Sequence, residues 1–274
     1  MILYSVSLKS KQISTNWDLT CRLLERTLRS IYNQKNKDFK VAVICHEKPD
    51  IQSYPDLIYH QVNFLPPKKC VSEMVLDRDI KELIGRKIGK ELNSDYIMAI
   101  DYDDCISSRI SEFINCKSQL SVAPDGFYAD RGYIYYESSK KIVPKSDLYK
   151  CCGSTVAMKS ELCDAPDSWD YDELAKFKKN GFLHSHGDLV EYWRSKGKRL
   201  ERFPFESCIY VRPDFETSLY DMNSALAISI QRKDIKVLLS PLKRKLTKFL
   251  YSQDINEDIR KEFGLDIGVQ PTYA

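Results

Sequence analysis

The stretch that decides the fold is YIMAIDYDD, residues 96–104, in which an apolar run leads directly into three carboxylates. A short apolar run of this kind is typical of a strand buried in a parallel sheet. Residues 79–93, just before it, are polar and rich in helix formers, as a strand–helix–strand unit requires. The carboxylates therefore follow the carboxyl end of a buried strand, where open α/β sheets bind their ligands.

The three acids are Asp101, Asp103 and Asp104. Carboxylates this close repel one another, so burying them calls for a cation. We expect Mg²⁺ or Mn²⁺, because a small hard ion takes one or two carboxylates and completes its shell with water and phosphate oxygens. The alternative is a solvated acidic turn, since short D-x-D strings are common. The strand before it and the helical pattern of residues 107–119 favour a metal and phosphate site.

The N-terminal part extends this pattern into a sheet. Apolar, β-forming runs predict strands over residues 2–8, 39–45 and 58–62. Leucine and isoleucine recur at helical spacing after the predicted N-cap Asn16, so an amphipathic helix is expected over residues 17–33. A polar helix is expected over residues 74–93. The order strand, helix, strand, strand, helix, strand predicts half of a doubly wound α/β sheet.

Past residue 119 the signals are shorter. Aromatic alternation predicts two strands, residues 126–130 and 132–136, that pair as a hairpin. The tyrosines of the second strand could stack on a sugar, although aromatic strands more often belong to a core. Further elements are expected as strands over residues 153–158 and 207–211 and helices over residues 169–179 and 189–196.

Composition sets limits on the function. With 274 residues, 43% hydrophobic content and a net charge of +3, the chain suits one large domain with an appendage and is too weakly basic to indicate a nucleic-acid partner. Residues 2–6 already read as a strand, so no signal peptide is expected, and no apolar run approaches a membrane span. The nine cysteines lack paired zinc spacing and are interpreted as reduced, buried thiols in a cytoplasmic protein.

The C-terminal segment has a different character. Residues 231–250 carry seven lysines and arginines against one acid, together with an apolar face of leucine, valine and phenylalanine. A basic amphipathic helix of this type can lie on an anionic membrane, which would place the protein at the cytoplasmic membrane face. The alternative is a helix packed on the domain with its lysines solvated. We expect a catalytic domain over residues 1–222 and a basic helical extension over residues 223–274.

Five segments together resemble the GT-A fold glycosyltransferases, in particular their large family-two-like group. The resemblance covers about residues 1–218 and is carried by the following stretches: LRSIYNQ (28–34), FKVAVI (39–44), IGRKIGKELNSDYIMAIDYDD (84–104), HGDLVEYWRSKGKRL (186–200) and YVRPDFETS (210–218). The block at 84–104 is the most specific of them. The resemblance implies a GT-A type single α/β domain, with a mostly parallel central sheet flanked by helices and followed by the helical tail.

The resemblance also implies roles around the acidic turn. Asp101 and Asp103 would form the D-x-D motif and hold Mn²⁺ or Mg²⁺ on the diphosphate of a nucleotide-sugar, and Asp104 would contact the ribose, the donor sugar or a metal-bound water. Arg86, with Lys87 as a substitute, would face the diphosphate.

Further implied roles lie at the other strand ends. Ser7 and the loop of residues 9–11 would border the nucleotide, and Glu47 would stand in for the acid that reads the base. The second strand ends in Cys45, His46 and Glu47 rather than in an acid, so the base is not identified.

For the catalytic base the resemblance points to Asp188, with His186 as the second candidate. A carboxylate whose pKa is raised by partial burial can accept the proton of an acceptor hydroxyl. Asp188 and Ser185 could instead cap the following helix, and His184 and His186 could bind metal or form a structural pair. Gly187 stands where another acid is common in the family, and Glu216 replaces an asparagine of the terminal element.

The function predicted from the sequence is a metal-dependent, inverting glycosyltransferase that uses a UDP- or GDP-sugar. Its acceptor would be a hydroxyl of a glycan or glycolipid, as in polysaccharide biosynthesis. A nucleotidyltransferase is one alternative, although the loop of residues 7–15 lacks the glycines such an enzyme needs for phosphate. Two further alternatives are a non-catalytic module that binds nucleotide-sugar or glycan and an α/β protein with a solvated acidic turn.

Overall fold

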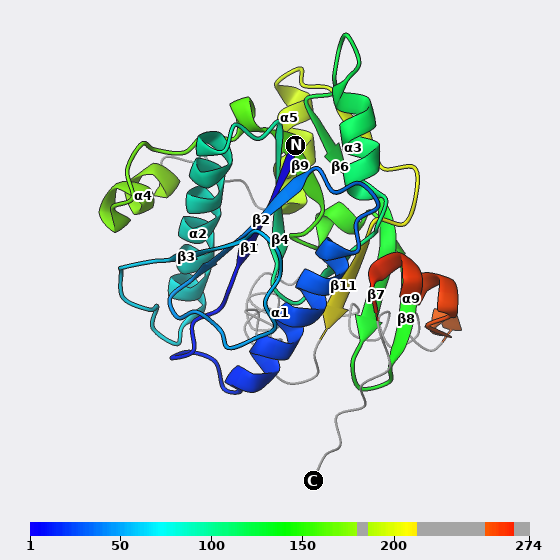
Figure 1. Ribbon diagram of the computed structural model, residues 1–274, viewed down its shortest axis with the longest axis horizontal. Helices are drawn as coiled ribbons and strands as arrows, with labels where there is room; N and C mark the ends of the chain where they lie inside the picture. The colour runs from blue at the N-terminus through cyan, green and yellow to red at the C-terminus, as the bar shows by residue number, and fades with distance from the viewer. Residues whose placement is uncertain (180–185, 213–249, 266–274) are drawn as a thin grey trace, which may run out of the picture.

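The computed structural model describes residues 1–179, 186–212 and 250–265. Its centre is a seven-stranded sheet in the order β10-β6-β9-β4-β1-β2-β3 (Figure 1). All neighbouring pairs in it run parallel except the two that involve β9. The strands of this sheet are β1 (Ile2–Ser7), β2 (Phe39–Cys45), β3 (Leu57–Gln61), β4 (Tyr96–Asp101), β6 (Gly126–Tyr128), β9 (Val156–Lys159) and β10 (Leu200–Arg202).

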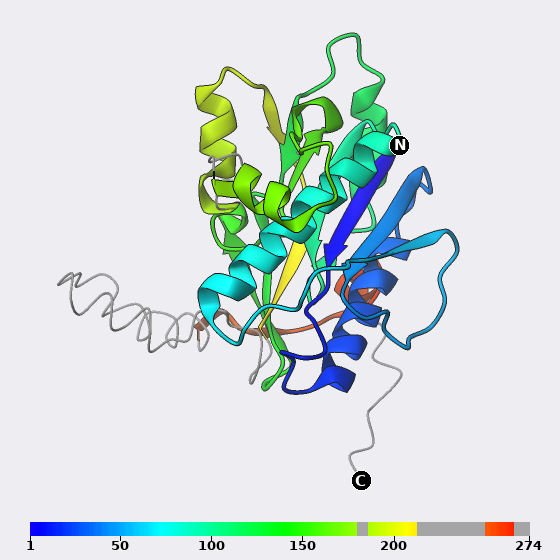
Figure 2. The ribbon, with the colours of Figure 1, turned by 90° about the vertical axis from the view of Figure 1, so that its left-hand side faces the viewer.

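Helices cover both faces of this sheet. The alternate residues Tyr4 and Val6 of β1 pack with Leu24 and Leu28 of α1 (Trp17–Tyr32), while Leu3 packs on the opposite face with Ile84 of α2 (Val71–Glu91). Figure 2 shows α1 and α2 on opposite sides of the sheet. Because both faces of the sheet are covered at its centre, β1, β2 and β4 are largely buried, which is why their sequences read as mostly hydrophobic runs.

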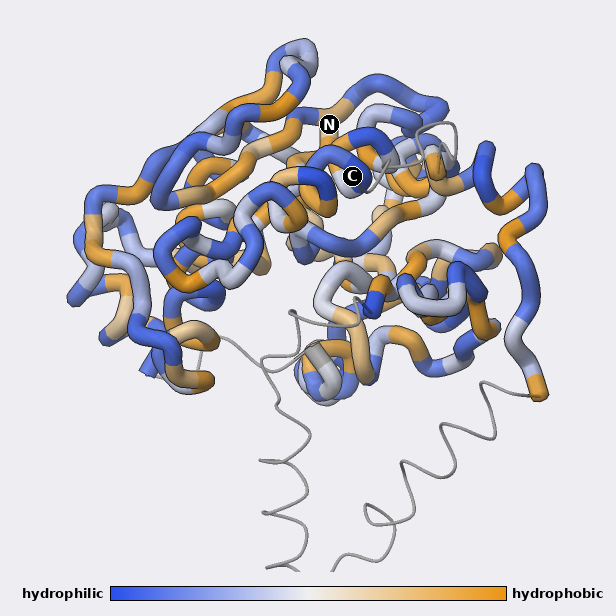
Figure 3. Tube along the Cα trace, turned by 90° about the horizontal axis from the view of Figure 1, so that it is seen from below, coloured by the Kyte–Doolittle hydropathy of each residue, from blue (hydrophilic) through white to orange (hydrophobic). Residues whose placement is uncertain are grey.

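A second, five-stranded sheet adjoins the first, in the order β12-β8-β7-β11-β5. Its strands are β5 (Cys105–Ile106), β7 (Arg131–Tyr136), β8 (Lys141–Ser146), β11 (Cys208–Arg212) and β12 (Gln253–Asp254). Strand β5 begins four residues after β4 ends, so the acidic turn joins the two sheets. The hydropathy-coloured trace shows hydrophobic segments running through the interior between hydrophilic loops (Figure 3).

Shorter helices surround the sheets. They are α3 (Ile110–Ser118), η1 (Leu148–Lys150), η2 (Ser160–Leu162), α4 (Tyr171–Phe177), α5 (His186–Ser195) and α9 (Glu257–Phe263). Helix α9 lies beside β7 and β8 (Figure 1), and its Phe263 is buried in a core shared with Ile142 and Ile209. The described part of the C-terminal segment therefore packs on the second sheet.

The fold class expected from the sequence is confirmed: the chain is an α/β protein with a mostly parallel sheet flanked by helices. Asn16 caps α1, its side chain accepting the Leu19 N–H at 2.9 Å. The predicted hairpin of residues 126–136 is wrong, because β6 and β7 belong to different sheets and β7 pairs with β8. Alternation of period two shows which residues share a face of a strand, but it does not identify the partner strand.

Other expectations concern the C-terminal segment. The basic stretch of residues 231–249 lies outside the described residues, and the boundary at residue 222 stays a prediction. Within the described part of the chain, no helix combines the length and the apolar character needed to cross a bilayer.

Candidate functional site

The acidic turn lies at the carboxyl edge of the large sheet, as the sequence predicts. Asp101 ends β4 and is in register with Ser7, the last residue of β1, which is in turn in register with Ile44 of β2. The turn is closed by the Asp104 N–H, which donates to the Asp101 carbonyl at 3.2 Å. Ser7 and Asp101 are therefore neighbours at the edge where α/β sheets bind ligands.

Hydroxyl groups of α1 fix the two sides of this turn. Thr27 Oγ1 donates to the Tyr102 carbonyl at 2.8 Å, and the Ile106 N–H donates to Ser30 Oγ at 3.2 Å. Both hydroxyls belong to buried residues of the helix. The backbone of the acidic turn is consequently attached to a packed helix rather than to a mobile loop.

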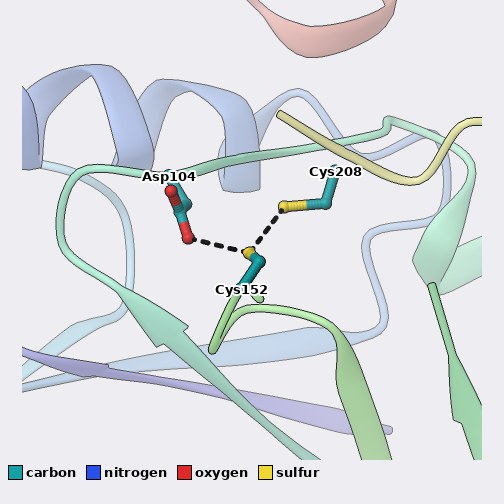
Figure 4. A group of neighbouring side chains, drawn as sticks. All are labelled: Asp104, Cys152 and Cys208. Atoms are coloured by element: carbon teal, nitrogen blue, oxygen red, sulfur yellow. Dashed lines mark hydrogen bonds between the residues drawn. The ribbon is translucent and has the colours of Figure 1, made fainter. Parts of the chain in front are cut away.

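Asp104 is the innermost of the three acids. Its side chain is fully buried and accepts hydrogen bonds from Ser154 Oγ at 2.7 Å and the Val211 N–H at 3.0 Å. It also accepts one from Cys152 Sγ at 3.2 Å, which Figure 4 shows. Burial, followed by the charge of Asp101, raises its pKa to about 7. These contacts give Asp104 the role of joining the β9 loop and β11 to the turn. The contact with donor or metal water expected from the sequence stays a prediction.

Asp101 and Asp103 lie nearer the surface. Asp103 is 8% exposed and Asp101 is half-buried. Burial, together with the charges of Asp104 and Asp101, raises the pKa of Asp103 well above its usual range, while Arg26 acts to lower it. Holding these carboxylates ionised side by side therefore costs free energy that a cation would offset. Their oxygen donors are those that Mg²⁺ and Mn²⁺ prefer, so the donor set fits such an ion.

Gly153 makes the space for Asp101. A Cβ at this position would lie 2.5 Å from Asp101 Oδ2 and 3.2 Å from its Cγ. The next residue, Ser154, accepts the Asp101 N–H at 2.8 Å. The loop before β9 thus receives the Asp101 side chain and holds its backbone. Nothing in the sequence around GST, residues 153–155, indicates this function.

Two basic residues of α2, Arg86 and Lys87, pair with acids of their own helix, and their place at a diphosphate stays a prediction. Arg86 pairs with Glu82 at 2.7 Å and donates to the Asp164 carbonyl at 3.4 Å. Lys87 lies 3.4 Å from Glu91 and over the Trp169 ring. The carboxylates of the acidic turn are absent from the contacts that the structure gives to either residue.

Arg78, two turns earlier on α2, is the residue that the sequence reasoning missed. Burial acts to lower its pKa, but the charges of Asp79 and then Asp101 offset that effect and raise it. Its side chain is one-third exposed, and its guanidinium donates to Asp79 at 2.8 Å. Of the two arginines of α2, Arg78 is therefore the one whose pKa is raised by the charge of Asp101.

A buried charged network lies at the ends of β1 and β2. Lys81 Nζ donates to Asp77 Oδ2 at 2.7 Å and to the Leu8 carbonyl at 2.8 Å, and His46 Nε2 lies 2.7 Å from Asp77 Oδ1. Burial would raise the pKa of Asp77, but hydrogen bonds from His46 and Lys81 and the lysine charge lower it overall. The i, i+4 spacing of Asp77 and Lys81 is the sequence signal for this pair.

Glu47 lies beside the loop after β1. It accepts hydrogen bonds from Ser10 Oγ at 3.2 Å and from the Lys11 N–H at 3.0 Å. The structure thus brings Glu47 to the loop of residues 9–11, as expected for two parts of one binding surface. Whether either part contacts a nucleotide stays a prediction.

Asp188 is exposed in the first turn of α5. Helix α5 is linked to η1 by Tyr149, whose hydroxyl donates to Glu191 at 3.3 Å, and η1 leads into Cys152 and Gly153 beside the acidic turn. The side chain of His186 and residues 180–185, which include His184 and Ser185, lie outside the described part of the chain. The roles of Asp188 and His186 are untested.

Two tyrosines of strand β7 pack into a hydrophobic core. Tyr133 and Tyr135 pack against the core that contains Phe263 and Ile209. The Tyr133 and Phe263 rings meet edge to face at 6.1 Å. The core interpretation of these tyrosines agrees with the structure.

Fold and site together define an α/β protein with a fixed acidic turn at the carboxyl edge of its sheet. No protein-family model matches the sequence, and a search among curated proteins finds no match. Solved structures similar to the chain include residues 1–349 of TarS from S. aureus, alone (TM-score 0.42, 12% identity) and in complex with UDP-GlcNAc (TM-score 0.45, 14% identity). These matches cover 77% and 81% of the chain and 60% and 62% of the TarS fragment.

A third similar structure is a cytidylyltransferase from Leptospira borgpetersenii, with a TM-score of 0.39 and 12% identity over 75% of this chain and 76% of that one. Of the TarS fragment, residues 1–349, the chain spans about three-fifths of the length. At this degree of similarity the matches decide neither a family nor an activity, which must rest on the site.

Proposed function

We propose that the protein is a metal-dependent glycosyltransferase that moves a sugar from a nucleoside-diphosphate donor to a hydroxyl group, with inversion. The observation that carries the proposal is the turn, fixed by hydrogen bonds to α1, that carries Asp101 and Asp103 at the carboxyl end of β4 beside Ser7 of β1, where the charge of Asp101 helps to raise the pKa of Asp103. Two carboxylates held in this place suit a divalent ion that accompanies a diphosphate.

Asp101 and Asp103 would hold Mg²⁺ or Mn²⁺. When bound, the ion neutralises the negative charge that gathers on the leaving diphosphate. Gly153 keeps Asp101 in place by leaving room for its carboxylate, and Thr27 keeps the backbone of the turn fixed. If the residues of a site are already ordered before the donor binds, less binding free energy is lost in ordering them.

Arg78 takes the role that the sequence assigns to Arg86. It is one-third exposed and shares an electrostatic environment with Asp101, so it is placed to meet a diphosphate at the same edge. Its planar guanidinium suits phosphate oxygens. The donor would be a UDP- or GDP-sugar whose nucleoside lies along Ser7, residues 9–11 and Glu47.

The acceptor hydroxyl needs a base, and Asp188 is the residue we assign, with His186 as the second choice. Asp188 would take the hydroxyl proton while the acceptor oxygen attacks the anomeric carbon from the face opposite the diphosphate. The carbon–oxygen bond to the diphosphate then breaks, and the nucleoside diphosphate leaves. General-base catalysis of this kind is worth about 10²–10⁴ in rate.

The acceptor we propose is a glycan or glycolipid, and the basic stretch of residues 231–250 would hold the protein at an anionic membrane face. Flotation with anionic liposomes at low salt, lost at high salt, is the expected result for the full chain. Absence from the lipid fraction at low salt would contradict the membrane part of the proposal and leave the transfer reaction untouched.

The decisive experiment is a screen of nucleotide-sugars for hydrolysis with and without Mn²⁺. One donor should be hydrolysed only with the ion, and Asp103→Ala should abolish the activity. Arg78→Met should weaken donor binding, whereas Arg86→Met, a matched change on the same helix, should affect it little. Release of inorganic pyrophosphate from a nucleoside triphosphate would indicate a nucleotidyltransferase instead, and metal-independent binding without turnover would indicate a binding module.

A further inference from the structure

Three buried side chains lie close together next to the acidic turn, and the proposed reaction does not use them as a group. They are Asp104 from the turn, Cys152 from the loop before β9 and Cys208 from the start of β11 (Figure 4). Cys152 is 1% exposed, and the other two are fully buried. Their ligand atoms all lie within 4.8 Å of one another.

Two distances in this group are close to those of a tetrahedral metal centre. The two sulfurs are 3.7 Å apart, and Cys152 Sγ lies 3.2 Å from Asp104 Oδ2. Two sulfurs bound to one zinc ion at ~2.3 Å and at the tetrahedral angle would lie ~3.8 Å apart, and a bound sulfur and oxygen ~3.5 Å apart. These two pairs would need to shift by only a few tenths of an ångström, while the third pair, Cys208 Sγ and the Asp104 carboxylate, lies within 4.8 Å and would have to close in on the ion. The two cysteines are free thiols, not a disulfide.

The ligand types select the class of metal. Two thiolates and one carboxylate suit a borderline-soft ion such as Zn²⁺, and they are poor ligands for Mg²⁺ or Mn²⁺. The site would thus differ in chemistry from the oxygen-only pair Asp101 and Asp103, although it lies next to them. Three protein ligands leave the fourth tetrahedral position to a small ligand such as water.

We propose that Asp104, Cys152 and Cys208 form a zinc site that fixes the acidic turn to the two sheets. The three ligands belong to segments far apart in the chain: the β4–β5 turn, the loop after η1, and β11 of the second sheet. The same loop carries Gly153 and Ser154, which contact Asp101 and its backbone. A zinc ion would therefore set the position of the D-x-D carboxylates without touching the substrate.

The test is metal content and cobalt spectroscopy of the full-length protein, purified under reducing conditions. We expect about one zinc ion per chain, and after exchange to Co²⁺ a thiolate-to-cobalt charge-transfer band in the near ultraviolet. Cys208→Ser should lose the zinc and weaken the band. Cys163→Ser is the matched control: Cys163 is also buried but lies elsewhere, near the Met158 carbonyl, and the variant should keep both signals.

Two further measurements separate this site from the proposed catalytic one and from misfolding. Asp101→Asn should abolish Mn²⁺-dependent donor hydrolysis but keep the cobalt band. Removing zinc from the wild-type protein with a chelator should lower its melting temperature, and Zn²⁺, but not Mg²⁺, should restore it. A wild-type protein that holds no zinc and gives no thiolate band with Co²⁺ would overturn the proposal and leave the group as a buried thiol–thiol and thiol–carboxylate contact.

Discussion

Replacing Gly153 by alanine isolates the geometry of the D-x-D motif. The backbone of Gly153 is not in the left-handed region, so alanine introduces no backbone strain there. The new Cβ would, however, lie 2.5 Å from Asp101 Oδ2, ~1 Å inside the distance at which non-bonded atoms are comfortable. Either the Asp101 carboxylate or the loop before β9 must move by that amount.

A displacement of this size has a calculable effect on binding. A misplacement of ~1 Å can cost a factor of ~10² at a functional site. With nucleoside diphosphate and Mn²⁺ at ~100 times the dissociation constant, wild type should gain ~2.7 kcal/mol, and a variant that binds 100-fold more weakly only ~0.4 kcal/mol. For a domain of this size that is a rise in melting temperature of ~5–11 °C for wild type and ~1–2 °C for the variant.

The assay is a thermal shift with and without Mn²⁺ for UDP and GDP, followed by donor hydrolysis. Gly89→Ala is the control, because its Cβ would meet the flexible end of Ile97 near the start of β4, in the core and away from the turn. That variant should lower the melting temperature yet keep the metal-dependent rise. If Gly153→Ala keeps the full rise and normal hydrolysis, Asp101 is not a metal ligand in the position we assign.

Other substitutions test the remaining parts of the site. Asp188→Asn should lower the transfer rate ~10²–10⁴-fold with donor binding intact, since only proton removal is lost. Glu191→Gln, on the same helix, should transfer at the normal rate. Equal steady-state transfer rates for the two variants would refute the base assignment. Lys81→Met should destabilise the fold by ~3–5 kcal/mol in urea unfolding, because Asp77 stays buried with His46 as its remaining partner. A loss below ~1 kcal/mol would show that His46 alone compensates the charge of Asp77. In metal-free protein, the pKa of Asp104 is raised from 3.8 to about 7, so between these pH values the folded state holds a proton that the unfolded state releases. Stability should therefore fall as the pH rises from about 4 to 7, and the raised pKa of Asp103 acts in the same direction. Asp104→Asn should make the decline shallower in chemical denaturation across pH, and an unchanged slope would assign it to other groups.

The first half of the fold is readable from the sequence because its strands are buried on both faces. Such strands give continuous apolar runs, and the observed bounds of β1, β2 and β4 lie within two residues of the predicted ones. The acidic turn follows from the end of β4 alone. Short elements are not readable in the same way: β5 has two residues, and β8 contains Pro144, which argues against a strand in any local analysis.

The site is only partly readable for a related reason. Asp101 and Ser7 meet because the ends of adjacent parallel strands share an edge, and this follows from topology. Gly153 and Cys208 reach the turn through β9 and β11, whose places are set by long-range pairing that leaves no periodic signal. Arg78 and Arg86 are eight residues apart and so lie ~12 Å apart along the axis of α2. The C-terminal part of the helix packs near the start of β4, where Gly89 meets Ile97, so the choice of Arg78 depends on how far along the strand the helix is placed.

The hydrogen bond from the Val211 N–H to Asp104 also orders events during synthesis. Strands β1 to β4 pair among themselves, so a nascent chain can assemble them soon after residue 101 leaves the ribosome. The innermost carboxylate then waits for a donor that is translated more than a hundred residues later, and Cys208 arrives with it. Until that strand docks, α1 already holds the backbone of the turn, but the Asp104 carboxylate lacks the Val211 N–H and Cys208, so the acidic turn is completed late, after most of the large sheet has formed.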